Sequence, residues 1–233
     1  PDATRWYMIS NSNPWDNLKF DIDGVSEVSR KFFGTLFNTY SFFVIYANID
    51  DFDINKKIIP ITKRPEIDKW IISELNRLIK EVDEALDKYD ATIAARNIST
   101  FVNDLLSNWY VRLSRRRFWK GELSDDKLSA YHTLFECLDK VCRLIAPLAP
   151  FFADRLFLDL NKENHSEVKS SVHLTKFPTS NVKLRHVELE KKMNYARGIS
   201  SLALSIRKKN QIKVRQPLNK LIVPVKNISE KKS

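Results

Sequence analysis

The sequence predicts an all-α protein, an antiparallel helix bundle followed by a truncated α/β tail. Apolar residues recur at helical spacing along several long segments. Short connectors rich in Pro, Asp, Ser or Gly separate these segments, as expected at helix ends. Of the 233 residues, 43% are hydrophobic, which is enough for a sizeable core. Only 4 glycines occur, and neither a Rossmann fingerprint nor a P-loop motif is present.

The N-terminal part is predicted to contain a short helix, a loop and one long aromatic helix. Residues 2–10 form the short helix candidate. Residues 11–23, rich in Asn, Asp and Pro, are typical of an ordered loop. From 25 to 48, Phe, Tyr and Val recur at helical spacing, so we expect a helix enclosed by several others.

The middle of the chain predicts two long helices. Residues 50–64 form a polar connector. Pro65 is favourable at the first position of the helix that follows, and this helix carries a long amphipathic stripe. Asp90 can cap the next helix, which runs to about Trp119, where Gly121 ends it.

Two more helices are predicted before residue 161. Ser124 caps a helix that reaches about Ile145. Pro147 and Pro150 break or kink the chain, because proline cannot continue a helix hydrogen-bond ladder. Residues 151–160 then form a short further helix.

The C-terminal part mixes one helix with two scraps of possible strand. Residues 172–174 alternate in polarity and could form a short strand, and a last helix spans roughly 185–209. Residues 221–225 resemble a β-strand without a neighbour, and a strand is not stable alone. We therefore expect three parts: a connector at 1–24, a helical bundle at 25–160, and a junction helix with the start of a truncated subdomain at 161–233.

Composition limits the possible partners. Thirty-nine Lys and Arg against 29 Asp and Glu give a net charge of +10, which favours a polyanionic partner. Cys137 and Cys142 lie about 140° apart on a helix, so we expect two buried thiols and neither a disulfide nor a shared metal. The four histidines have no ligand spacing, so no metal site is expected. The longest apolar run, residues 40–47, is far below the roughly 20 residues that span a bilayer, and we expect no membrane partner.

Residues 109–119 are the most informative stretch, with four arginines and four aromatic rings. At about 100° per residue, one helical stripe collects Asn108, Arg112, Arg115 and Trp119. An adjacent apolar stripe includes Leu113. Guanidinium groups bind phosphates in bidentate fashion, and they and aromatic rings stack on exposed bases. The stripe is therefore a candidate nucleic-acid surface, and a core helix with solvated or acid-paired arginines is the alternative.

Four residues of this stretch receive binding roles. We predict that Arg112 and Arg115 hold phosphates and that Trp119 offers a stacking surface for a base. Lys120 contributes a peripheral positive charge. These residue types fit one task, since phosphate contacts fix the register of a nucleic acid and base contacts specify it.

The remaining cations divide into structural and binding candidates. Arg116 lies nearer the apolar stripe, so we predict a structural arginine that snorkels or forms an ion pair. The pattern gives Arg117 no definite role. A second binding cluster is predicted at the end of the last helix and in the turn after it: Arg207, Lys208, Lys209, Lys213 and Arg215. The alternative for this cluster is neutralisation of a helix C-terminus by basic side chains.

Six short blocks follow one another in a characteristic order: residues 2–7 with 13–21, 30–36, 108–119, 144–151, 171–174 with 177–178, and 212–218. This order resembles the C-terminal, anticodon-binding part of the isoleucyl-tRNA synthetases, a family of class I aminoacyl-tRNA synthetases. Valyl and leucyl enzymes share the helical architecture. Asn-Pro-Trp-Asp-Asn-Leu-Lys-Phe-Asp at 13–21 and Ser-Val-His-Leu at 171–174 favour the isoleucyl family.

The resemblance implies a tRNA-binding domain whose parent enzyme ligates isoleucine to its tRNA with ATP and Mg²⁺ in the cytoplasm. The chain opens on Pro1 without a start Met, so we expect a piece of a longer protein. The catalytic and editing sites of the family would lie upstream. We therefore assign no catalytic residue, cofactor or metal to this piece, and expect it to be inactive alone.

The expected partner is the tRNA that accepts isoleucine, bound through the anticodon stem and loop by a monomer. Two alternatives stay open. One is the equivalent domain of a valyl- or leucyl-tRNA synthetase. The other is a basic helical scaffold that binds acidic proteins, for which the net charge alone would suffice.

Overall fold

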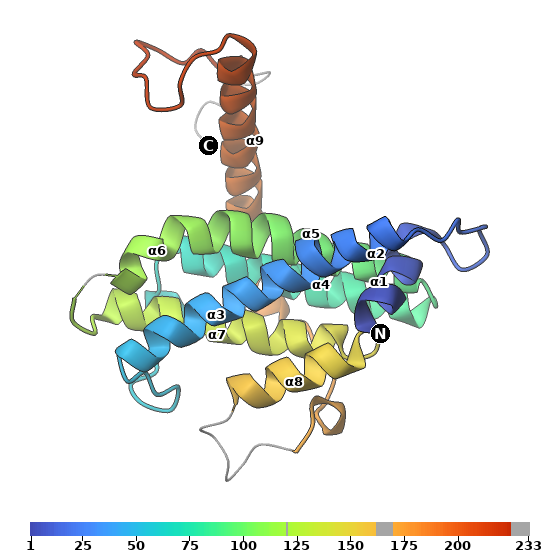
Figure 1. Cartoon of the computed structure of the whole chain (residues 1–233). Coiled ribbons are helices and arrows are strands. Elements are labelled where there is room, and N and C mark those ends of the chain that lie inside the picture. Colours follow the sequence, from blue (N-terminus) through green and yellow to red (C-terminus); the bar gives the residue numbers. More distant parts are fainter. Residues whose placement is uncertain (120, 162–169, 225–233) are drawn as a thin grey trace. The chain divides into compact units, whose positions relative to one another are not determined.

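The computed structural model describes residues 1–119, 121–161 and 170–224. The chain forms two compact units, Pro1–Arg185 (unit 1) and His186–Ser233 (unit 2). Unit 1 is a helix bundle, and the described residues of both units contain no strand (Figure 1). The predicted all-α bundle is therefore confirmed.

The N-terminal part of unit 1 contains a short helix and a long, continuous one. Asp21 caps the long helix, because its carboxylate accepts hydrogen bonds from the backbone N–H groups of Asp23 and Gly24. In the short helix Trp6 stacks on Phe32 with ring centroids 4.1 Å apart. The elements are α1 (Asp2–Asn11), then α2 (Ile22–Val28), the π-helical η1 (Ser29–Phe33) and α3 (Gly34–Ile49).

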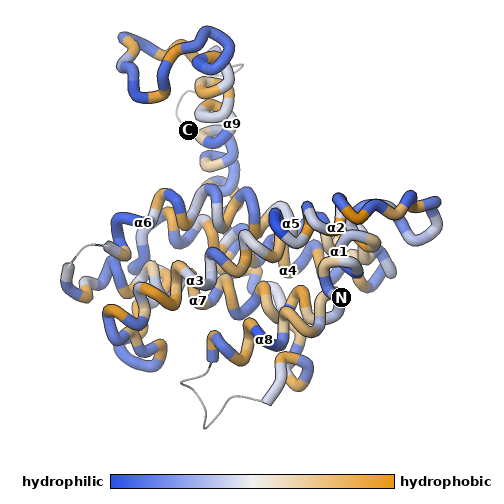
Figure 2. The backbone as a smooth tube through the Cα atoms, viewed as in Figure 1, coloured by the Kyte–Doolittle hydropathy of each residue, from blue (hydrophilic) through white to orange (hydrophobic). Residues whose placement is uncertain are grey.

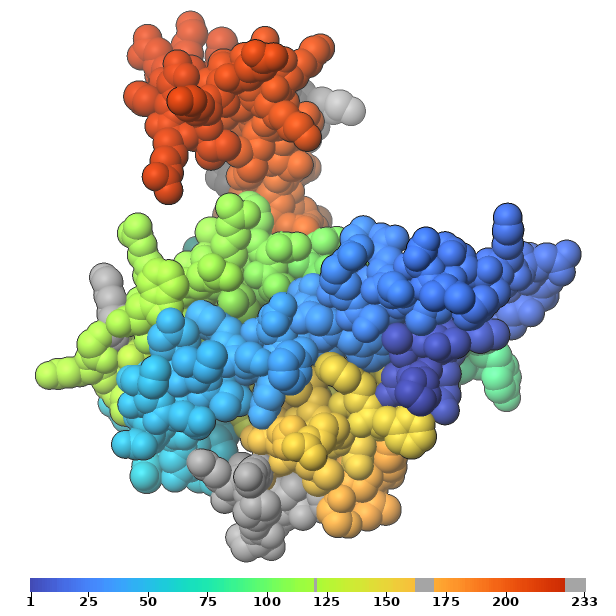
Figure 3. All heavy atoms as spheres, in the orientation of Figure 1, coloured from blue at the N-terminus to red at the C-terminus, as the bar shows by residue number. Residues whose placement is uncertain are grey.

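Helix α3 is less enclosed than its aromatic sequence predicts. Phe43 and Leu36 are buried, but Phe37, Ile45 and Ile49 are more than half exposed. Figure 3 shows α3 running uncovered along the front of unit 1. The prediction of a helix enclosed by several others is wrong, because one face of α3 packs on the bundle and the other is exposed.

Helix α4 (Glu66–Asp87) is the centre of unit 1 and packs against α5, η3 and α7. A short 3₁₀ turn, η2 (Ile61–Lys63), precedes it, and Pro65 occupies its N-cap position. Trp70 and its neighbours inside the helix are almost completely buried. The predicted amphipathic helix is confirmed.

The predicted helix from Asp90 to Trp119 is also one continuous helix, with a long π-helical segment in its middle. It consists of α5 (Ala91–Thr100), η3 (Phe101–Val111) and α6 (Arg112–Trp119). The Asp90 carboxylate accepts a hydrogen bond from the backbone N–H of Ile93, as expected of an N-cap.

The π-helical segment changes which side chains face the core. In an α-helix of about 3.6 residues per turn, a side chain four positions further along points about 40° away from the first one around the helix axis. The wider turns of a π-helix reduce this angle, so side chains four positions apart stay on one face. Constant α-helical rotation predicts that Leu113 lies in the buried stripe, and this prediction is wrong, because Leu113 is 54% exposed. Six side chains at most 1% exposed recur every four positions: Ile98, Val102, Leu106, Tyr110, Ser114 and Phe118.

The next two helices follow the predicted boundaries. Helix α7 (Asp125–Ile145) begins where the Ser124 hydroxyl accepts the backbone N–H of Lys127, and α8 (Pro150–Leu160) begins at a proline. Cys137 and Cys142 are free, buried thiols as predicted, and burial raises the pKa of each. None of the described helices combines the length and apolar character needed to cross a membrane.

The strand predicted at 172–174 is instead a 3₁₀ turn, η5 (Val172–Leu174). The reason is a hydrogen-bonding partner on α8. The Asp154 carboxylate accepts both the Ser171 hydroxyl, at 2.7 Å, and the backbone N–H of Val172, at 2.8 Å. A second 3₁₀ turn, η6 (Val182–Leu184), contacts α4 near the end of unit 1.

Unit 2 consists of α9 (Val187–Lys209) and the chain that follows it. The predicted last helix is confirmed. The strand predicted at 221–225 is not formed over residues 221–224, and Val225 lies outside the described residues. A strand needs a hydrogen-bonding neighbour, and the described part of the chain offers none.

Candidate nucleic-acid interface

The C-terminal end of the long helix in unit 1 presents the predicted stripe to solvent. Asn108, Arg112, Arg115 and Trp119 are all exposed, with Trp119 55% accessible. Within the described residues neither Arg112 nor Arg115 forms an ion pair. Figure 2 shows hydrophilic residues along α6. This surface, which we call the arginine face, is defined by these four residues.

The structural arginine of this stretch is Arg117, for which the sequence pattern indicates no role, and not its neighbour Arg116. Arg116 was predicted to be structural, but it is exposed and forms no ion pair with a described residue, so that prediction was wrong. Arg117 has a side chain only 14% exposed and lies in a buried cluster. The cause is the π-helical segment, whose rotation turns position 117 and not 116 towards α4.

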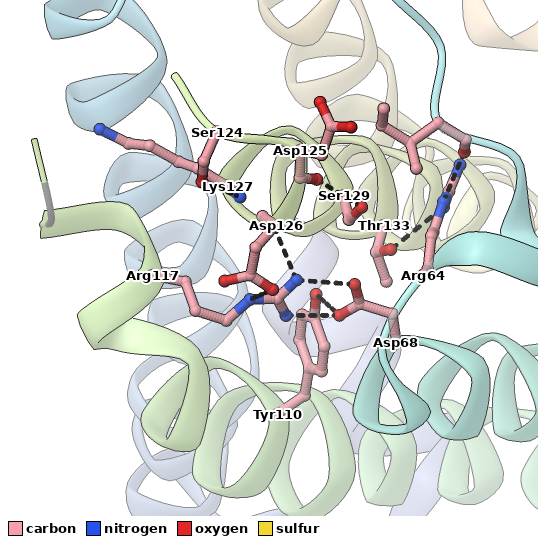
Figure 4. Close-up of polar contacts among 11 residues, drawn as sticks. Arg64, Asp68, Tyr110, Arg117, Ser124, Asp125, Asp126, Lys127, Ser129 and Thr133 are labelled. Carbon is pink, nitrogen blue, oxygen red and sulfur yellow. Dashed lines mark hydrogen bonds and ion pairs between the residues drawn. The ribbon is translucent and has the colours of Figure 1, made fainter. Parts of the chain in front are cut away.

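A buried ion-pair cluster holds the end of the long helix to α4 and α7 (Figure 4). The Arg117 Nη1 and Nη2 atoms donate to the two carboxylate oxygens of Asp68 at 2.6 and 2.8 Å, a bidentate pair. The Tyr110 hydroxyl donates to Asp68 Oδ1 at 2.8 Å. Arg117 also donates to the carbonyl oxygen of Asp126 at 2.8 Å, and its Nε lies 3.0 Å from the Asp126 carboxylate.

The electrostatics of this cluster favour a permanent charge pair. Burial, together with the Asp68 carboxylate, raises the pKa of Tyr110, so its hydroxyl stays a hydrogen-bond donor. Burial opposes the charge of Arg117, but the hydrogen bonds and charge of Asp68 outweigh it and raise the pKa of Arg117. The cluster therefore acts as a fixed anchor beneath the arginine face.

A second anchor holds the loop that follows α6. The Lys127 side chain is 4% exposed, with its Nζ 2.6 Å from Asp50 Oδ2 and donating to the Gly121 carbonyl at 3.1 Å. The Tyr131 hydroxyl donates to the same carboxylate, and burial with Asp50 raises the pKa of Tyr131. Gly121 has a φ of +22°, a backbone conformation that favours glycine. Lys120, predicted as a peripheral charge, lies outside the described residues.

His132 offers a pH probe of the same packing. His132 is 4% exposed, and its Nε2 lies 3.3 Å from the Lys57 carbonyl. Burial lowers the pKa of His132, and Arg64 adds to this, so the unfolded chain takes up a proton that the folded one resists. This part of the stability is full above the unfolded pKa of about 6.5 and is lost as the pH falls towards the folded value.

We therefore expect His132→Gln to flatten the loss of stability between pH 7.5 and pH 5.5. The slope should change by at most about 1.4 kcal/mol per pH unit, the limit for one proton. Urea denaturation at several pH values measures it. The raised pKa of Glu136 makes stability increase as the pH falls, which is opposite to the effect of His132. Glu136 is present in both proteins, so the difference between their pH profiles isolates the effect of His132. Parallel pH profiles for the two proteins would contradict a role for His132.

In unit 2 the structure brings the second predicted cluster together at the end of α9. Lys208, Lys209, Lys213 and Arg215 are exposed. Arg207 differs, because its side chain is half-buried and its Nη1 donates to the carbonyl oxygens of Lys213 and Gln216, both at 2.9 Å. One member of the cluster is therefore engaged with the protein itself, a contact that no sequence pattern indicated.

The arginine face and the basic cluster at the end of α9 are both exposed and cationic, so each can hold a polyanion. Comparison with known proteins identifies the class of protein. The family described as the anticodon-binding domain of tRNA ligases matches residues 68–222, which include both surfaces. The chain belongs to this family.

Similar proteins narrow the class further. The chain is 55% identical to the isoleucine–tRNA ligase of Bacteroides thetaiotaomicron over 230 residues, which are 99% of the chain and 20% of that protein. It is 55% identical over 225 residues to the same ligase of Cytophaga hutchinsonii (97% and 20%), and 45% identical over 230 residues to that of Dehalococcoides mccartyi strain 195 (99% and 22%). The chain thus spans about a fifth of the relatives it matches.

A solved structure supports the fold. The LeuRS in a ternary complex with tRNA and LeuAMS from Agrobacterium radiobacter K84 matches with a TM-score of 0.58 and 19% identity, covering 79% of this chain and 20% of that one. At this level of identity the match shows a shared helical architecture.

Proposed function

We propose that this chain receives the anticodon stem and loop of an isoleucine tRNA as part of a longer isoleucine–tRNA ligase. The observation that carries the proposal is the arginine face, which is exposed and unpaired within the described residues and lies over a buried anchor. The family match and the similarity to isoleucine–tRNA ligases support it. The chain alone would not catalyse the ligation.

The proposed mechanism divides the work between a rigid frame and an exposed surface. Arg112 and Arg115 hold phosphate oxygens and fix the register of the tRNA, and Trp119 stacks on an unpaired base. Arg116, exposed beside them, adds a further phosphate contact. The Arg117–Asp68 pair holds the helix end in place, so little order has to be gained on binding.

The remaining features of the longer protein are proposed from the resemblance. ATP and Mg²⁺ would bind in its catalytic part, outside this chain, in a cytoplasmic, monomeric enzyme. Residues 1–24 would connect to that part, residues 25–160 would form the anticodon-binding bundle, and 161–233 would lead into a further subdomain. The described residues contain no group of three or more His, Cys, Asp or Glu side chains that could hold a metal ion.

A competition gel shift tests the proposal. We expect the purified chain to shift labelled isoleucine tRNA at low salt. Unlabelled tRNA should displace the labelled tRNA from the chain far better than an acidic protein of equal charge. Displacement by the acidic protein at the same concentration would favour a protein-interaction scaffold. Equal affinity for leucine, valine and isoleucine tRNAs would place specificity outside this chain and contradict the isoleucine assignment to it.

A further inference from the structure

The end of α9 folds back on itself through one arginine. The Arg207 Nη1 atom donates to the backbone carbonyl oxygens of Lys213 and Gln216 at 2.9 Å each, and lies 3.5 Å from that of Val214. These carbonyls belong to residues 210–216, which we call the basic loop. A single guanidinium nitrogen thus contacts three carbonyl oxygens within one four-residue stretch of backbone.

Backbone hydrogen bonds join only the first half of the basic loop to α9; the second half forms a turn of its own, in which the N–H of Gln216 donates to the Lys213 carbonyl at 3.0 Å. The N–H of Ile212 donates to the Arg207 carbonyl at 2.9 Å, and Gln211 adopts a left-handed φ of 56°, which turns the chain back at the helix end. Among the described residues, the hydrogen bonds that join positions 213–216 to α9 are those of Arg207. The attachment of the second half of the loop to α9 therefore depends on this side chain.

Neither packing nor charge replaces the hydrogen bonds of Arg207 to the basic loop. Every residue from 213 to 216 is exposed, so little apolar burial holds the loop in place. Lys213 and Arg215 also repel each other and the lysines at the end of α9, which favours an open loop. The Arg207 guanidinium, bonded to the carbonyls of this loop, opposes both tendencies.

We propose that Arg207 is a positioning residue for nucleic-acid binding: it fixes the basic loop so that Lys213 and Arg215 face the phosphates together. The inference rests on the proposed function. It reverses the part that the sequence pattern gave to Arg207, which is then not itself a phosphate contact. Ordering the loop before binding lowers the conformational cost of placing two long cationic side chains on one backbone.

The first test needs no nucleic acid. Trypsin cleaves after Lys213 and Arg215, and cleavage requires the loop to open. We expect Arg207→Gln to raise the cleavage rate at these two sites severalfold, as followed by mass spectrometry. The matched control is Lys208→Gln, which removes the neighbouring, exposed charge and should leave the rate unchanged. Equal rates in Arg207→Gln and the unchanged chain would overturn the proposal.

The second test is a double-mutant cycle on tRNA affinity. Arg207→Gln should weaken binding by at least about threefold more than Lys208→Gln, and should lower the salt slope by about 2, against about 1 for a single phosphate contact. In a Lys213→Gln/Arg215→Gln background the change at Arg207 should have little further effect. Additive losses would mean that Arg207 contacts phosphate directly, and would overturn its positioning role.

The two tests separate the inference from the function on which it rests. If the unchanged chain binds no tRNA, the proposed function fails while the protease result still decides whether Arg207 orders the basic loop. If the unchanged chain binds tRNA and the cycle is additive, the function stands and the positioning role fails.

Discussion

Arg117→Met is expected to lower the free energy of unfolding by roughly 3–5 kcal/mol, the usual cost of leaving a buried charge without its partner. Asp68 is completely buried, and after the change its carboxylate would keep only the Tyr110 hydroxyl as a described hydrogen-bond partner. Urea denaturation followed by circular dichroism at pH 7 measures the loss.

The chain supplies a matched control in the adjacent residue. Arg116→Met removes the same group from the same helix, but from an exposed position, and should change the stability by less than about 0.5 kcal/mol. Adding Asp68→Asn to Arg117→Met should recover part of the loss, because the stranded charge is then removed. Similar stabilities for the two single variants would show that the buried pair does not hold the helix.

Arg112→Ala/Arg115→Ala is expected to weaken tRNA binding by on the order of tenfold per arginine, taking about 1.5 kcal/mol for a charge-assisted hydrogen bond. Each lost phosphate contact should also lower the slope of log affinity against log salt by about 0.7 to 0.9, since fewer counterions are released. Binding titrations at several salt concentrations measure both effects.

The control for this variant removes two exposed cations from other helices. Arg155 on α8 and Lys80 on α4 are well exposed and form only surface ion pairs. Arg155→Ala/Lys80→Ala therefore removes the same charge elsewhere and should leave the affinity almost unchanged. An equal loss in this control would mean that net charge, and not the arginine face, binds the tRNA. A lower melting temperature in Arg112→Ala/Arg115→Ala would instead assign these arginines to the fold.

The fold followed from local signals to a large extent. Asp90 and Ser124 cap the helices that they were predicted to cap, and Pro150 begins a helix after a predicted break. These signals act within one helical turn, so they can be read along the sequence. The strand predicted at 172–174 failed because the Val172 N–H bonds to Asp154, a partner 18 residues away whose role no pattern indicates.

The candidate site was predicted only in part. The exposure of Arg112, Arg115 and Trp119 followed from helical periodicity and is confirmed. The structural role of Arg117 was missed because its partner Asp68 is 49 positions away, and because periodicity assumed a uniform α-helix. The four-residue spacing of apolar and small residues from 98 to 118 was the available signal for the wider turns.

The π-helical segment has a consequence for how this helix tolerates changes of length. The same turns that bring Tyr110 and Phe118 onto the core also fix the angle at which Arg112 leaves the surface. Deleting or inserting one residue within Phe101–Val111 would rotate everything after it by the turn of one residue. The anchor and the exposed arginines would then lose alignment together, so the number of residues in this segment is constrained as tightly as their identity.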